Sequence, residues 1–182
     1  MGKFDKFKVD LRGMKAASAT FSMDIDNEYF ANIDGPEVQK GKAEVITTVT
    51  ANHGKFDIRF DIHGMVIVTC DRCLDEMELP INTTGNISVK LGETFGEEGD
   101  TIIVPEKDGF INVAWYIYEF VALAIPIKHV HAPGKCNRDM TTRLDKISVQ
   151  EGEDGELIMP SDDDEETATD PRWDALKEIM DN

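Results

Sequence analysis

The sequence predicts an α+β fold in which a curved, mainly antiparallel and barrel-like β-sheet carries one packed helix, with a second helix at the C-terminus. Apolar and polar residues alternate along much of the chain, and alternation is typical of half-buried strands because successive side chains leave opposite faces of a sheet. A chain of 182 residues suits one ordinary domain with tails. We expect a β-rich domain at residues 1–148, an acidic disordered linker at 149–169 and a terminal helix at 170–182.

The clearest strand signal is a hairpin at residues 43–62. Residues 43–50 are rich in β-branched side chains, residues 56–62 alternate, and the Asn-His-Gly at 52–54 supplies a turn. His63 and Gly64 are expected to interrupt the run before residues 65–69 resume it. Further short strands are predicted at 4–9, 76–79, 86–91, 101–104 and 110–113.

Two helices are predicted from helical spacing and stop signals. Residues 113–125 follow Asn112, a good cap, and end before Pro126. The terminal helix begins with Asp170 as cap and Pro171 in the first turn. One stripe of that helix contains Trp173, Leu176, Lys177 and Met180. This stripe can dock on its own domain or on a partner, and the sequence leaves both alternatives open.

The net charge of −17 disfavours nonspecific binding to nucleic acid or anionic lipid and predicts a basic direct partner. The charge is uneven, because residues 151–166 hold nine acidic residues and no Lys or Arg, whereas residues 128–146 hold five basic ones. The basic stretch could contact RNA. Ordinary solvation of the surface explains both runs equally well.

Cysteine usage predicts a reduced, cytoplasmic protein. Three cysteines cannot all pair with one another, and the charged start of the chain does not match a secretory signal. No apolar run approaches the roughly 18 residues of a membrane span. The four histidines have no recognisable nucleophile setting, and the glycines at 92–96 lie among acidic residues, unlike a phosphate loop. We therefore expect no enzyme activity and no small-molecule substrate.

The cysteines offer a candidate metal site. Cys70 and Cys73 form a Cys-x-x-Cys directly after an apolar run, and Cys136 follows His131 in a later loop. Two thiols at that spacing, with a His and a Cys from a second loop, can complete the four ligands of tetrahedral zinc. In the alternative interpretation, Cys70 and Cys73 are small turn residues and Cys136 is an unrelated thiol.

These motifs together resemble the YceD family of large ribosomal RNA subunit accumulation proteins. The shared order is Val-Thr-Cys-Asp-Arg-Cys-Leu after a strand, an apolar segment ending in Ala-Ile-Pro at 124–126, Val-His and Cys136, and a terminal Asp-Pro-Arg at 170–172. The resemblance covers roughly residues 4–181. Many members have a further cysteine soon after the late one, whereas here Met140 lies in that region. Only the Cys70, Cys73, His131 and Cys136 set can therefore hold metal.

The resemblance implies a noncatalytic factor in ribosome biogenesis that supports synthesis, processing or accumulation of large-subunit ribosomal RNA. Its partner would be the RNA precursor or, alternatively, a basic large-subunit ribosomal protein that an acidic chain can shield. A third and least favoured class is a Cys/His hydrolase. The best candidates for a partner surface, which can also be solvated loop residues, are Asp71, Arg72, Lys128, Lys135 and Arg138.

Overall fold

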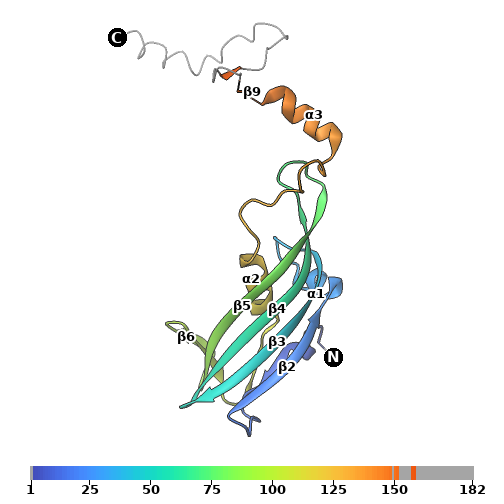
Figure 1. Cartoon of the computed structure of the whole chain (residues 1–182). Coiled ribbons are helices and arrows are strands. Elements are labelled where there is room, and N and C mark those ends of the chain that lie inside the picture. Colours follow the sequence, from blue (N-terminus) through green and yellow to red (C-terminus); the bar gives the residue numbers. More distant parts are fainter. Residues whose placement is uncertain (1, 149, 152–156, 159–182) are drawn as a thin grey trace, which may run out of the picture. The chain divides into compact units, whose positions relative to one another are not determined.

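The computed structural model describes residues 2–148, 150–151 and 157–158, in two compact units divided after Asn137. Each unit is described by itself. The first is built on a six-stranded sheet of order β2-β3-β4-β5-β7-β6, antiparallel except for the parallel pair β5–β7 (Figure 1). Its strands are β2 (Ser18–Ile25), β3 (Lys40–Asn52), β4 (Lys55–Thr69), β5 (Glu76–Gly92), β6 (Gly96–Glu98) and β7 (Thr101–Pro105).

The sheet is open, so the predicted barrel is wrong although the α+β class and the mainly antiparallel pairing are confirmed. β2 forms one edge and β6 the other, and the two are not paired in the described structure. A barrel covers its core by closing on itself, whereas here one face of the sheet is covered by other elements. These are α1 (Asn27–Ile33), α2 (Ala114–Leu123) and a two-stranded sheet of β1 (Lys8–Asp10) and β8 (Phe110–Asn112).

The predicted hairpin is confirmed as β3 and β4, which are longer than expected. His53 and Gly54 both have positive φ, at 48° and 82°, as a two-residue turn of the primed type requires. The expected break at Gly64 is wrong, because β4 runs through it. A Cβ on Gly64 would lie 2.4 Å from Ala43 Cα, so glycine is what allows the two strands to pass so closely here.

The two short strands expected at 76–79 and 86–91 are one continuous strand, β5. Pro80 lies within it, paired with Met65 of β4. β7 pairs only with the last part of β5, from Ser88 onward. Pro80 therefore lies where the outer side of β5 has no neighbour in the described ladder, and a missing N–H is tolerated at such an edge.

The N-terminal and helical predictions need smaller corrections. The expected strand at 4–9 is a 3₁₀ turn, η1 (Asp5–Phe7), followed by β1, while the short strands near 101–104 and 110–113 are confirmed as β7 and β8. α2 begins one residue later than expected, at Ala114, and ends two residues earlier, at Leu123. Its N-cap is therefore Val113 and not Asn112, although the Ala114 N–H donates to Asn112 Oδ1 at 3.0 Å. β2, α1 and β6 were not expected.

The covered face of the sheet forms the hydrophobic core. Phe60 of β4 is fully buried and packs on Phe120 of α2, with ring centroids 5.7 Å apart. The same Phe120 ring lies over Gly85 of β5, where a Cβ would come within 2.4 Å of it. Phe7 and Phe30 complete the core from η1 and α1. Close packing of rings on a glycine thus fixes where α2 crosses the sheet.

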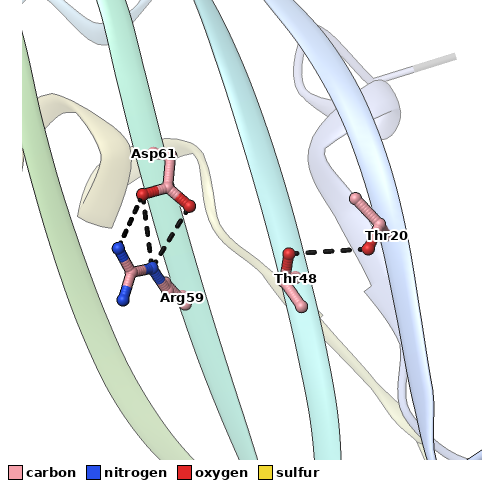
Figure 2. Close-up of polar contacts among 4 residues, drawn as sticks. All are labelled: Thr20, Thr48, Arg59 and Asp61. Atoms are coloured by element: carbon pink, nitrogen blue, oxygen red, sulfur yellow. Dashed lines mark hydrogen bonds and ion pairs between the residues drawn. The ribbon is translucent and has the colours of Figure 1, made fainter.

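The other face is open and polar, as Figure 2 shows for β2, β3 and β4. There Thr20 and Thr48 face each other across neighbouring strands with hydroxyl oxygens 3.5 Å apart. Arg59 pairs with Asp61 two residues along β4, with Nη2 2.9 Å from Oδ1. α1 and α2, the helices of this unit, lie on the other side of the sheet (Figure 1).

The second unit contains α3 (Arg138–Ile147) and the two-residue strands β9 (Gln150–Glu151) and β10 (Leu157–Ile158), which pair antiparallel. α3 was not expected from the sequence. Most of the predicted 149–169 linker and all of the predicted 170–182 helix lie outside the described residues, so both stay predictions. Among the described helices, none has the length and apolar character needed to cross a membrane.

Candidate metal centre

The four candidate ligands meet at the end of β4. Cys70 follows its last residue, Cys73 lies in the turn toward β5, and His131 and Cys136 lie in the segment after α2. One ligand atom from each of the four lies within 4.8 Å of the other three. The structure thus brings together all four residues that the sequence proposed as a set.

The Cys-x-x-Cys turn is held by its own backbone. The Cys70 N–H donates to the Asp75 carbonyl at 2.9 Å, and the Leu74 N–H donates to the Cys70 carbonyl, also at 2.9 Å. Leu74 adopts φ of 63°, an uncommon left-handed conformation for a branched side chain. Cys70 and Cys73 are both buried. The turn therefore directs two thiols inward at the cost of one strained residue.

A short ladder between Asp71 and His129 aligns the second loop with this turn. The Asp71 N–H donates to the His129 carbonyl at 3.0 Å, and the His129 N–H donates to Asp71 Oδ2 at 2.7 Å. The His129 ring adds contacts to Asp71 Oδ1 at 3.6 Å and to the Pro126 carbonyl at 3.0 Å. With His129 fixed in this way, His131 is placed two residues further along, beside the cysteines.

His131 contacts both early cysteines. Its backbone N–H donates to Cys70 Sγ at 3.4 Å, and its ring Nδ1 lies 3.3 Å from Cys73 Sγ. Tetrahedral zinc with one S and one N ligand would separate these two atoms by about 3.6 Å. The observed spacing therefore agrees with coordination to within a few tenths of an ångström.

The surroundings of the cluster shift the pKa values of two of its thiols in opposite directions. Desolvation would raise the pKa of Cys70, but backbone hydrogen bonds from Cys73, His131 and Arg72 outweigh it and lower the pKa to about 6. Desolvation, followed by hydrogen bonds and repulsion from the other two cysteines, raises the pKa of Cys136 to about 11. Three thiols this close cannot all ionise without a cation, and a metal ion would supply that cation.

The donor set suits zinc. Three thiols and one imidazole form one of the usual donor sets of structural zinc sites, and four protein ligands leave no open position for a substrate. His131 and Cys136 are partly exposed, so a metal could enter from that side. Such a centre would clamp the β4–β5 turn to the loop after α2.

Comparison with known proteins places the chain in a family. A profile described as large ribosomal RNA subunit accumulation protein YceD matches residues 58–180, which is more than half of the chain. The chain belongs to the YceD family. The matched region contains all four candidate ligands of this YceD family member. No curated protein and no solved structure gave a match.

The predicted partner-surface residues of this YceD family member lie in different settings. Asp71 is committed to His129 and holds the loop in place. Arg72, Lys128 and Lys135 are exposed in the two loops that carry the four candidate ligands. Arg138 is the first residue of α3 and belongs to the second unit. The sequence pointed to Asp71 as a partner contact and gave no role to His129, because the pairing of the two loops is a tertiary feature.

Proposed function

We propose that this protein is a noncatalytic factor that supports the synthesis, processing or accumulation of large-subunit ribosomal RNA. The observation that carries the proposal is membership of the YceD family, whose description names accumulation of that RNA. The proposed place of action is the cytoplasm, where reducing conditions keep thiols available as ligands.

The proposal of binding without catalysis is supported by the arrangement of the cysteines. All three thiols of the chain converge with His131 within 4.8 Å. A nucleophilic cysteine needs an adjacent base and an open position for substrate, whereas four converging ligands suit a closed metal site. The chemistry therefore favours a structural role for this cluster.

We assign zinc to the cluster, with Cys70, Cys73, His131 and Cys136 as its ligands. Bound zinc would neutralise the thiolates and link two loops that are 58 residues apart in sequence at Cys73 and His131. The second of these loops, after α2, carries the exposed Lys128 and Lys135. Fixing these loops would keep the two lysines in constant positions for contact with RNA.

Depletion and rescue in the cell would test the proposed function. Without the protein, we expect large-subunit ribosomal RNA to fall relative to small-subunit RNA, and wild-type protein to restore it. His63→Gln, on the open sheet face, should rescue fully, whereas Cys73→Ser should rescue poorly. Unchanged large-subunit RNA after complete depletion would contradict the proposal.

A second candidate function is that of a chaperone-like binder of a basic large-subunit ribosomal protein. The net charge of −17 favours it, because an acidic chain attracts basic proteins and repels RNA at long range. Purification from lysate before and after nuclease treatment separates the two candidates. A protein partner that remains bound after nuclease supports the chaperone, and a partner lost with the RNA supports direct action on RNA.

A further inference from the structure

One edge of the main sheet is unprotected. β2 pairs only with β3 among the described strands. The Ala51 N–H donates to the Ala17 carbonyl at 2.9 Å, and antiparallel ladders alternate, so the backbone groups of every second residue after Ala17 point toward β3. Those of Ser18, Thr20 and Ser22 point outward. Further along, Lys6 Nζ donates to the outward carbonyl of Asp24 at 3.1 Å.

The other edges of the same sheet carry the usual protections. β6 has only three residues, two of them glutamates, and the unpaired part of β5 contains Pro80 and two glutamates. By contrast, β2 is eight residues long and contains no proline and no charged residue before Asp24. Short length, charge and proline are the devices that stop strand edges from pairing. β2 lacks these features before Asp24, so its edge is available for pairing with another strand.

The side chains of β2 also leave apolar surface uncovered. Phe21 lies on the core side of the sheet, opposite the buried Thr47, but is 40% exposed. Met23 on the same side is partly buried against the core. An added strand would cover Phe21 while leaving the polar face with Thr20 free (Figure 2).

We propose that two copies of this chain associate through β2, paired antiparallel to form one continuous sheet. The outward backbone groups allow a register in which Thr20 of one copy faces Ser22 of the second copy. This register places Phe21 directly opposite Phe21 of the second copy, on the core side. Aromatic residues facing each other across strands stabilise a sheet, and two-fold symmetry is the commonest arrangement of homodimers.

The charges at the two ends of β2 favour a second copy as the occupant. Arg12 and Lys15 precede the strand, while Asp24, Asp26 and Glu28 lie at its other end, and all five positions are exposed. Lys6 lies beside Asp24 as well, so the second end has three acidic side chains against this one ammonium group. Antiparallel pairing brings the basic end of each copy beside the acidic end of the other, twice by symmetry. These local charge pairs oppose the repulsion between two chains that each carry a charge of −17.

A single pair of strands buries less surface than the roughly 1,200–2,000 Å² of a stable interface, so the dimer should be weak and depend on concentration. Sedimentation of the purified full chain from about 5 μM to about 500 μM, a range that spans such weak affinities, should show a shift from monomer to dimer. A monomer throughout the range overturns the proposal.

Two variants and a control locate the interface. Ser22→Pro removes an outward N–H and leaves the backbone hydrogen bonds between β2 and β3 in place, although it also removes the exposed bond from Ser22 Oγ to Glu44 of β3 at 3.0 Å. It should weaken association at least tenfold with little change in the melting temperature. Should Ser22→Pro perturb the fold, Phe21→Lys serves instead, because it places two positive charges opposite each other. Thr84→Lys, on the open face of β5, should dimerise like wild type. Loss of the dimer in Thr84→Lys, or a normal dimer in both edge variants, refutes pairing through β2.

Discussion

Replacing Cys73 with serine should remove zinc and the stability that zinc provides. Cys73 is 2% exposed, and its Sγ lies 3.3 Å from His131 Nδ1, so it is a central member of the cluster. Loss of a residue that only supports a metal ligand lowers the metal affinity by about 10–100-fold. Loss of a ligand itself should therefore lower the zinc affinity by at least about 100-fold. A factor of 100 corresponds to about 2.7 kcal/mol.

With zinc in excess over both dissociation constants, the same difference is expected in the free energy of unfolding. For a unit of this size, it corresponds to a fall in the melting temperature of about 8 °C. The assay combines zinc analysis, competition with a chromophoric chelator and thermal unfolding. Wild-type protein should hold about one zinc per chain and lose stability on chelation. His63→Gln is the matched control, because His63 is exposed on the open sheet face.

Two outcomes would refute the reasoning. Substoichiometric zinc in wild-type protein, with three thiols that react freely, would show that the cluster does not hold the metal. Equal melting temperatures of wild type and Cys73→Ser, with and without chelator, would show that any bound metal does not stabilise the fold. Either result would favour the alternative in which the cysteines are small packed residues.

Three further predictions follow from the packing, the loop contact and the thiol pKa values. Gly85→Ala should destabilise by about 1–3 kcal/mol because the added Cβ meets an aromatic ring at 2.4 Å, whereas Gly96→Ala, which meets nothing within 4 Å, should be nearly neutral in denaturant unfolding. Asp71→Ala should speed amide hydrogen exchange in residues 127–131 and lower zinc affinity, and unchanged exchange would contradict a holding role for Asp71. Zinc affinity should fall as the pH drops through the Cys70 pKa of about 6, because the metal then competes with a proton on that thiol. It should rise from pH 6 to 8, because binding must displace the proton of Cys136, whose pKa is raised to about 11. Zinc titrations at several pH values measure both effects, and an affinity independent of pH would contradict thiolate ligation.

Clamping of two loops by zinc would give the site a consistent structural role. The Asp71–His129 ladder already aligns the loops in the described structure. The metal would add a second link two residues further along, at His131. Loops that carry binding residues are most effective when a rigid scaffold positions them, and here the ends of β4 and α2 provide it.

Several local features were readable from the sequence alone. The β3–β4 hairpin followed from β-branched residues before Asn-His-Gly and alternation after it, because strand propensity, side-chain period and turn chemistry act over a few residues. The Asn112 contact at the start of α2 and the helix stop before Pro126 are equally local. The alternation of Ala19, Phe21, Met23 and Ile25 is an equally local signal for β2.

Only the tertiary structure decided the rest. Whether the sheet closes depends on which elements cover its core face, and α1, α2 and the β1–β8 pair cover it without closure. Gly64 suggested a strand break because glycine weakens a strand, yet the close approach of Ala43 requires it. Two short strands were expected at 76–79 and 86–91, but they form one strand because an unpaired edge tolerates Pro80 between them. The sequence shows the spacing of Cys70 and Cys73 directly. That these two cysteines lie close to His131 and Cys136 depends on the contact between Asp71 and His129, which are 58 positions apart in the chain. Long-range contacts of this kind result from packing of the whole unit, which local sequence patterns do not determine.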